Sequence, residues 1–247
     1  MSQPLLKTVG LSLSFGGVTA ADGIDFELAE GERLAIVGQN GAGKTTFVNI
    51  CTGYLKPSAG QVYFDGKAIT GLSPRQITRK GVARSFQIPQ IFSDHTVREC
   101  LLVAASARRR KMGLFTSIDR SVDVTSVDET LELIQLSQRS HMKAILLPEG
   151  QRKLLDVAMA LVLNPRLLIM DEPTSGVSSD EKHELMETLM QALSERKVTS
   201  IFVEHDFEIV ERYATRIAAW ISGKIAADGP PKQVLEDPEV IRNVIGG

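Results

Sequence analysis

GQNGAGKTT, at residues 38–46, is the most informative stretch of this 247-residue chain. It fits the pattern G-x-x-x-x-G-K-[S/T], directly after the apolar segment Leu34–Val37 and before a helical pattern over Thr46–Cys51. Glycines let successive backbone N–H groups turn toward one anion, and the N-terminus of the following helix adds positive potential. The stretch therefore predicts a phosphate-binding loop between a strand and a helix.

Two side chains of this loop suit a nucleotide triphosphate. Lys44 would neutralise the terminal phosphates, and the hydroxyl of Thr45 is a suitable Mg²⁺ ligand. The alternative is a glycine-rich turn, but composition alone would produce the pattern in only about one chain per hundred of this length. The candidate nucleotide-binding residues of the loop are Gly38, Asn40, Gly41, Ala42, Gly43, Lys44, Thr45 and Thr46.

Outward from the loop, apolar β-type segments alternate with helical patterns, which predicts a layered α/β domain with a parallel core. Close to the N-terminus the pattern instead favours an antiparallel flank with a hairpin arm that ends at Asp65-Gly66. The expected core strands are Leu34–Val37, Leu167–Met170, Ser200–Val203 and Ile217–Ile221. The expected flank strands are Leu11–Phe15, Ile24–Leu28 and Gln61–Phe64.

Strand signals vanish between Thr96 and Val162, where helix-start signals replace them. This predicts a helical subdomain inserted into the core. The expected helix starts along the chain are Thr96 with Glu99, Ser126 with Glu129, Ser178 with Glu181, and Pro238.

Polar residues follow two of the expected core strands at their C-terminal ends, where open α/β sheets bind their ligands. Asp171 and Glu172 follow Leu167–Met170, and His205 comes shortly after Ser200–Val203. Asp171 suits Mg²⁺, held directly or through water, and Glu172 would accept a proton from an attacking water as general base. A strand that ends in Asp-Glu is usually only entering a turn, so this prediction depends on the phosphate loop upstream.

Together these elements resemble the nucleotide-binding subunits of ABC transporters over nearly the whole chain. Phe15 matches an aromatic that stacks on adenine, Gln87 in the segment 83–87 (ARSFQ) matches the glutamine that links Mg²⁺ and water to the helical subdomain, and Leu147–Gln151 (LPEGQ) matches the signature motif. His205 matches the switch histidine. The resemblance implies catalytic roles for Glu172, His205 and Gln87, metal binding by Thr45, Gln87 and Asp171, and nucleotide contacts from Phe15, Leu147, Gly150 and Gln151.

The same resemblance implies a P-loop NTPase (RecA-like) core within one ABC ATPase domain over residues 1–247. The core would comprise residues 1–90 and 163–247, and the helical subdomain about residues 91–162. It also implies ATP and Mg²⁺, membrane-spanning permease subunits, a separate solute-binding protein, and a second ATPase subunit, identical or related, in a head-to-tail dimer. Each ATP would then lie between one phosphate loop and the signature of the other subunit.

Two positions depart from the family pattern. The usual signature reads LSGGQ, whereas Pro148 and Glu149 occupy its second and third positions here. Because a carboxylate facing the triphosphate would repel it, we expect Glu149 to turn toward solvent or the helical subdomain. Ser178 replaces an aspartate that couples the two ATP sites, and we expect it to cap the next helix.

Within the family the resemblance is strongest to ATPases of the branched-chain amino-acid type. It rests on Phe15–Val18 (FGGV), the segment 83–87, a long insertion before the signature, the signature proline, and Asp237–Arg242. Urea or a small organic acid is the alternative solute. The other hypotheses are an ABC ATPase that acts as a mechanical switch on a nucleic-acid or ribosome complex, and a different phosphate-loop enzyme such as a small-molecule kinase or GTPase.

Composition limits the partners and the location. With 28 basic and 30 acidic residues the formal net charge is −2, so no global positive field attracts nucleic acid, and no nucleic-acid partner is expected. No stretch approaches the roughly 18 apolar residues that span a bilayer, and no secretory signal is recognisable. We therefore expect the chain to stay in the cytoplasm, and the resemblance implies a peripheral location on the cytoplasmic face of the inner membrane, bound to the permease. The basic run Arg108–Lys111 is interpreted as a solvated helix end, and Cys51 and Cys100 as reduced, packed thiols.

Overall fold

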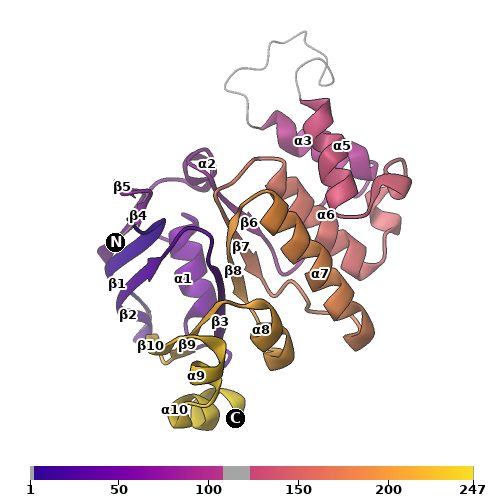
Figure 1. The fold of residues 1–247 in the computed structure, drawn as a ribbon. Coiled ribbons are helices and arrows are strands. Elements are labelled where there is room, and N and C mark those ends of the chain that lie inside the picture. Colours follow the sequence, from indigo (N-terminus) through magenta and orange to yellow (C-terminus); the bar gives the residue numbers. More distant parts are fainter. Residues whose placement is uncertain (1–2, 108–122, 247) are drawn as a thin grey trace. The chain divides into compact units, whose positions relative to one another are not determined.

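The computed structural model describes residues 3–107 and 123–246, and its chain divides into two compact units. The first unit comprises residues up to Val82 and from Thr199 onward, and the second comprises Ala83–Val198. Figure 1 shows the elements of both. The run Arg108–Lys111 lies outside the described residues. No helix in the described part of the chain is long and apolar enough to cross a membrane.

The first unit contains an antiparallel sheet in the order β2-β1-β4-β5, as expected for the N-terminal flank. Its central strand β1 pairs with β2 on one side and β4 on the other. Asp65 and Gly66 connect β4 to β5, with φ angles of 50° and 69°, so both adopt the left-handed backbone of a tight hairpin turn. The strands are β1 (Leu6–Phe15), β2 (Val18–Leu28), β4 (Ala59–Phe64) and β5 (Lys67–Ala68).

The first unit also contributes four neighbouring strands of a second sheet, in the order β10-β9-β3-β8. Strand β3 lies between β8 and β9 and pairs in parallel with both, which confirms the parallel core. Its residues from Leu34 to Val37 have no exposed surface, which explains the continuous apolar run in the sequence. The strands are β3 (Arg33–Gly38), β8 (Thr199–Val203), β9 (Arg216–Ile221) and β10 (Lys224–Gly229).

An aromatic cluster packs around the helix that follows the phosphate loop. Helix α1 (Lys44–Cys51) buries Phe47, whose ring centroid lies 5.5 Å from that of Phe26 and 5.0 Å from that of Trp220. These three rings come from α1, β2 and β9, so they join the helix after the loop to both sheets of the unit. The unit also contains α2 (Pro74–Thr78), α8 (Phe207–Tyr213), α9 (Pro231–Leu235), α10 (Pro238–Val240) and the π-helix η3 (Ile241–Ile245).

The second unit combines two neighbouring strands with four helices that contact one another. Strand β7 is fully buried and ends at Asp171, as the sequence predicts. The strands are β6 (Val82–Ser85, which begins at the boundary) and β7 (Leu167–Asp171). The α-helices are α3 (Val97–Ser106), α5 (Val124–Leu133), α6 (Glu149–Leu161) and α7 (Ser179–Glu195), and two 3-10 helices are η1 (Ser137–Arg139) and η2 (Ala144–Leu146).

Three of the four expected helix starts are confirmed. Thr96 and Glu99 form the expected capping box of α3, Ser178 is the N-cap of α7, and α10 begins at Pro238. The expected start at Ser126 is wrong, because Asp123 caps α5 and its carboxylate accepts a hydrogen bond from the Ser126 N–H. An aspartate three residues upstream performs the same capping role, so the helix was predicted correctly but its start was placed three residues too late.

The sequence missed strands β6 and β10. Strand β6 covers only Val82–Ser85, and β10 (Lys224–Gly229) alternates exposed and half-buried residues without a long apolar run. Both cysteines of the chain, Cys51 and Cys100, are free and buried, as expected for packed thiols.

Candidate active site

The phosphate loop of the first unit has the backbone that its glycines require. Gly41 and Gly43 have φ angles of 82° and 104°, in the region that glycine occupies without strain. A Cβ atom on Gly43 would lie 2.0 Å from the carbonyl oxygen of Ala20, so only glycine fits there. Helix α1 begins at Lys44 directly after this glycine. The strand-loop-helix arrangement therefore agrees with the prediction from the sequence.

The N-terminus of α1 is suited to an anion. No side chain caps it, and its first turn contains no acidic residue. Lys44 is only 6% exposed, and its Nζ donates hydrogen bonds to the carbonyl oxygens of Gly38 at 2.6 Å and Gln39 at 3.0 Å. The ammonium group is thus held inside the turn of the loop, beside the amide groups of the helix start. Positive charge and N–H donors converge there, which is the chemistry that binds phosphate.

His205 lies beside this loop because of strand register. The parallel pairing of β3 and β8 aligns Ile36 with Val203, so the residues that follow both strands leave the sheet at the same edge. A cavity of about 380 Å³ opens there, lined by Gly38, Gln39, Asn40, Glu204, His205, Phe207 and Val244. The first unit therefore brings His205 together with the start of the phosphate loop, although 167 positions separate Gly38 from His205 in the sequence.

Phe15 ends strand β1 next to a tight turn, where it pairs with Val18 and is 49% exposed. Single exposed aromatic rings are common on protein surfaces and need no ligand to explain them. The proposed stacking on adenine stays a prediction.

In the second unit, Asp171 forms a buried ion pair with Arg84. The Arg84 Nη2 atom lies 2.7 Å from Asp171 Oδ2, and both side chains are 8% exposed. Strands β6 and β7 are neighbours, which brings the two residues together. The sequence placed Arg84 only within a matching motif and did not predict this partner.

Glu172 and Gln87 are direct hydrogen-bond partners in the second unit. Gln87 Nε2 donates to Glu172 Oε2 at 2.7 Å. Glu172 has a φ of 49°, a left-handed backbone that is uncommon for a side chain of this size. Residues in such conformations cluster at functional sites, where their surroundings hold them in place. Two of the three expected catalytic residues therefore meet side chain to side chain.

Two charged residues of α6 surround this pair and were missed from the sequence. Lys153 Nζ donates to the carbonyl oxygens of Gln87 and Glu172, both at 3.0 Å. Asp156 accepts from the backbone N–H groups of Phe86 and Gln90, both at 2.9 Å. Burial raises the pKa of the Asp156 carboxyl above its usual value, whereas the two backbone hydrogen bonds act in the opposite direction. The sequence signal that could have identified Lys153 and Asp156 was the presence of charged residues among the apolar residues of α6.

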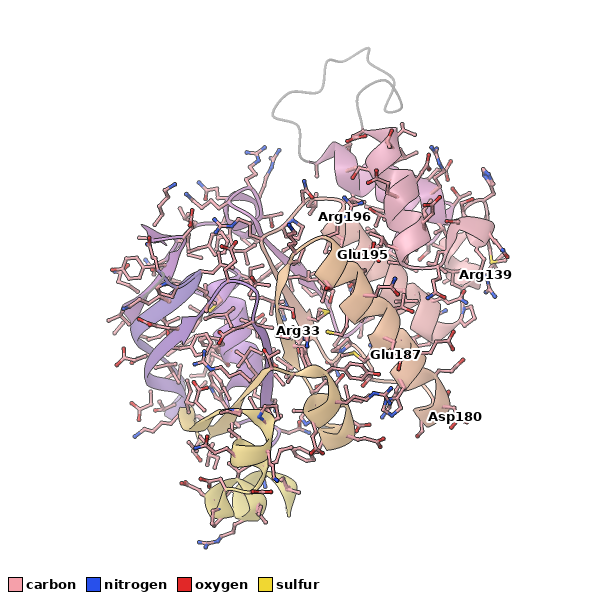
Figure 2. All side chains as sticks on the ribbon, viewed as in Figure 1. Arg33, Arg139, Asp180, Glu187, Glu195 and Arg196 are labelled. Atoms are coloured by element: carbon pink, nitrogen blue, oxygen red, sulfur yellow. The ribbon has the colours of Figure 1, made fainter. Side chains whose placement is uncertain are left out.

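The signature segment leads into α6, as the resemblance implies. Pro148 is the N-cap, and α6 begins at Glu149, so Gly150 and Gln151 lie in its first turn. Leu147 is only 2% exposed, and its backbone N–H donates to the carbonyl oxygen of Ala144 at 3.2 Å. Gln151 Oε1 accepts a hydrogen bond of 2.7 Å from Nη1 of Arg139, a residue labelled in Figure 2.

The two departures from the family pattern have local partners. Glu149 forms an ion pair with Arg152 of the same helix, whose Nη1 also donates to the carbonyl oxygen of Leu147 at 3.2 Å. This agrees with the expectation that Glu149 turns toward the helical part of the chain. Ser178 is the N-cap of α7, but its hydroxyl donates to Glu181 Oε2 at 2.6 Å instead of accepting a backbone hydrogen bond.

Comparison with known proteins gives consistent matches. The family model described as ABC transporter matches residues 21–175. The high-affinity branched-chain amino acid transport ATP-binding protein BraF of Pseudomonas aeruginosa is 34% identical over 253 residues, which cover 100% of this chain and 99% of that protein. LivG of Escherichia coli, with the same description, is 35% identical over 254 residues, with the same coverage.

Solved structures agree with these matches. The ADP conformation of MJ1267, described as an ATP-binding cassette of an ABC transporter, has a TM-score of 0.85 and 32% identity and covers 98% of both chains. The cbiO1 structure from Clostridium perfringens, described as part of the ABC transporter complex cbiONQ, has a TM-score of 0.83 and 31% identity, covering 98% of this chain and 94% of that one.

Proposed function

This chain belongs to the ABC transporter family, and from that premise we propose that it powers the import of branched-chain or other small amino acids by hydrolysing ATP. The observation that supports ATP as substrate is the phosphate loop, where Lys44 at the start of α1 donates to the carbonyl oxygens of Gly38 and Gln39. The solute class is supported by relatives that match the chain over its full length, since BraF and LivG are described as branched-chain amino acid transport proteins.

We assign the chemical roles as follows. The loop residues and Phe15 bind the triphosphate and adenine, and Glu172 removes a proton from the attacking water, with which Gln87 makes a further hydrogen bond. His205 contacts the γ-phosphate. Leu147, Gly150 and Gln151 serve the ATP of a second subunit, through the N-terminus of α6.

Mg²⁺ is proposed at the phosphates, with Thr45 and Gln87 as protein ligands and with Asp171, whose Oδ2 is paired with Arg84, holding it directly or through water. Their hydroxyl, amide and carboxylate oxygens are the hard donors that Mg²⁺ prefers. In the described part of the chain no group of three or more His, Cys, Asp or Glu side chains could hold a metal ion. A site that takes most of its ligands from phosphate and water fits that composition. When bound, the ion would neutralise charge that develops on the phosphate oxygens.

Partners follow from the family. We propose permease subunits in the inner membrane, a second ATPase subunit in a head-to-tail dimer, and a separate solute-binding protein. The chain would then be peripheral on the cytoplasmic membrane face. A formal net charge of −2 gives no support to a nucleic-acid partner.

The loop assignment is tested by Lys44→Ala. We expect loss of ATP binding, measured with a fluorescent ATP analogue, because the variant lacks the only side-chain cation assigned to the phosphates. Lys197→Met, at an exposed position beyond α7, is the control for removal of a lysine charge. Unchanged affinity in Lys44→Ala would contradict the assignment.

The transport assignment is tested by purifying the chain from membranes together with its permease and reconstituting the complex. A rise in the ATPase rate with leucine, isoleucine or valine supports the proposed solute class. A response only to urea or a small organic acid would replace that class. Purification with ribosomes or nucleic acid instead of a permease would favour the mechanical-switch alternative.

A further inference from the structure

Helix α6 carries two buried charges of opposite sign, one turn apart. Lys153 is 4% exposed and Asp156 is 6% exposed. Lysine and aspartate are almost never buried unless they have partners, since removing an unpaired charge from water is costly. Their neighbours on the helix, such as Leu155 and Val157, supply the apolar packing. The apolar packing of α6 therefore does not explain why these two charged side chains are buried.

Lys153 closes a ring of hydrogen bonds around the proposed water-activating pair. Its Nζ donates to the carbonyl oxygens of Gln87 and Glu172 at 3.0 Å each, and the side chains of those two residues are joined at 2.7 Å. One ammonium group thus binds the backbone carbonyl oxygens of both residues, whose side chains are also joined. Displacement of Lys153 would change the position of both residues together.

Asp156 holds the same segment at two further points. Its carboxylate oxygens accept from the N–H groups of Phe86 and Gln90, at 2.9 Å each, so they bind one residue before Gln87 and three residues after it. Gln87 itself is exposed. The backbone around this exposed residue is therefore held by part-buried hydrogen bonds on both sides, all of them with side chains of α6.

Glu172 has the greatest need of such support. Its φ of 49° costs about 1 kcal/mol relative to a right-handed backbone. Its carbonyl oxygen accepts from both the Ser175 N–H, at 3.1 Å, and Lys153 Nζ. A charged donor makes a hydrogen bond roughly twice as strong as a neutral one, so Lys153 is suited to hold this conformation.

We propose that Lys153 and Asp156 are positioning residues that couple the signature helix α6 to Gln87 and Glu172. Their charges connect the helix that begins at the signature with the groups that activate water. A shift of α6, produced when its N-terminus engages the ATP of a second subunit, would be transmitted to Gln87 and Glu172 through these hydrogen bonds. This inference rests on the proposed ATPase function.

The test compares Lys153→Met, Lys153→Arg and Asp156→Asn in the full-length chain. Methionine keeps the length of lysine but donates no hydrogen bond, and asparagine keeps one acceptor oxygen. We expect kcat for ATP hydrolysis to fall about 30- to 100-fold in Lys153→Met, because small misplacements of reacting groups have effects of that size. The dissociation constant for ATP should change less than about twofold, since the phosphate loop lies outside these contacts. Lys153→Arg, which restores a charged donor, should recover part of kcat.

The matched control is Lys197→Met, which removes a lysine charge at an exposed position of the same unit and should keep the wild-type kcat. A second arm uses Gln87→Ala. If Lys153 acts through Gln87 and Glu172, adding Lys153→Met to Gln87→Ala should lower kcat much less than it does in the wild type. If Lys153 had a purely structural role, Lys153→Met would lower thermal stability, and its effect on kcat would add to that of Gln87→Ala.

The outcomes separate the two proposals. A Lys153→Met protein that hydrolyses saturating ATP at the wild-type rate overturns the coupling, and so does a loss of kcat/KM that comes entirely from a higher KM with kcat unchanged. If Lys153→Met does not fold, kcat and the dissociation constant for ATP are compared in Lys153→Arg and Asp156→Asn instead. Wild-type kcat in both variants would then overturn the coupling. A wild-type chain that binds ATP without hydrolysing it would instead sink the proposed function.

Discussion

Glu149 is a negative residue at a position where the resemblance predicts contact with a triphosphate. Its carboxylate pairs with Arg152, which also binds the carbonyl oxygen of Leu147. The side chains of Glu149 and Arg152 are 36% and 30% exposed, so solvent screens the pair and its contribution to stability is small. The effect of the ion pair on the electrostatic potential at the start of α6 is more important than its contribution to stability. With Arg152 in place, the first turn of α6 presents amide donors without a net negative charge.

This arrangement predicts opposite results for the two partners. Glu149→Ala should leave the ATPase rate nearly unchanged, because it removes a charge that is already neutralised. Arg152→Ala should lower kcat/KM for ATP about tenfold, since two unit charges ~10 Å apart interact by ~1.7 kcal/mol at an effective dielectric constant of about 20. Steady-state ATPase kinetics at low salt measure both.

The double variant Glu149→Ala with Arg152→Ala provides the control. It should return toward the wild-type rate, because the exposed carboxylate is then absent. A double variant as slow as Arg152→Ala would show that Arg152 acts by some other means. A large change of the ATPase rate in Glu149→Ala alone would contradict the view that Arg152 neutralises Glu149.

At this scale the sequence predicted local structure well and long-range partners poorly. The loop at 38–46 was recognisable because strand, glycines, lysine and helix follow one another along the chain. The ion pair between Arg84 and Asp171 was not, since 87 positions separate its members. For the same reason the contacts of Lys153 and Asp156 with residues 86–90 were not predicted, because those residues lie 66 or more positions upstream.

Among the elements, helix starts were predicted from a few adjacent residues. The α3 start has a complete capping box, in which Glu99 N–H donates to Thr96 Oγ1 at 3.2 Å and Thr96 N–H donates to Glu99 Oε2 at 2.8 Å. The α5 start was misplaced because Asp123 and Ser126 both carry suitable capping oxygens. Strand β10 was missed because one of its faces is solvent-exposed and its sequence lacks a long apolar run.

The box at α3 predicts the effect of Thr96→Ala on stability. Loss of the hydroxyl acceptor should lower the free energy of unfolding by about 1 kcal/mol. Urea denaturation followed by circular dichroism measures this change. Thr96→Ser, which keeps the hydroxyl, is the control and should stay within about 0.3 kcal/mol of the wild type. Equal losses in the two variants would mean that the threonine methyl group, and not the cap, stabilises α3.

On the scale of the whole molecule, we propose that the signature and the phosphate loop bind the same ATP only when two subunits meet. The ATP between two subunits would be held by the loop of one and by Leu147–Gln151 of the other. Hydrolysis would then be needed to separate them. The α/β fold class followed from the alternation of apolar strand segments with helical patterns along the chain, whereas the pairing of subunits came only from the family resemblance.

Glu172→Gln tests this picture. The amide keeps the size of the side chain but cannot accept the proton of water, so turnover should fall at least 100-fold. ATP binding should persist, and an ATP-dependent dimer should be visible by size-exclusion chromatography. Glu187→Gln, on α7 in Figure 2, is the control and should remain active. Fast turnover by Glu172→Gln would overturn its role as the base.

The position of β3 between β8 and β9 has a consequence for synthesis of the chain on the ribosome. Residues 33–38 emerge early, but both parallel neighbours belong to segments that begin at Thr199 and Arg216. At about 5 to 20 residues per second, the strand waits on the order of ten seconds to half a minute for them. Its apolar residues Leu34–Val37 lack these partners throughout that time. A nascent chain that stops before Thr199 should therefore bind chaperones or aggregate, even though its phosphate loop is already complete in sequence.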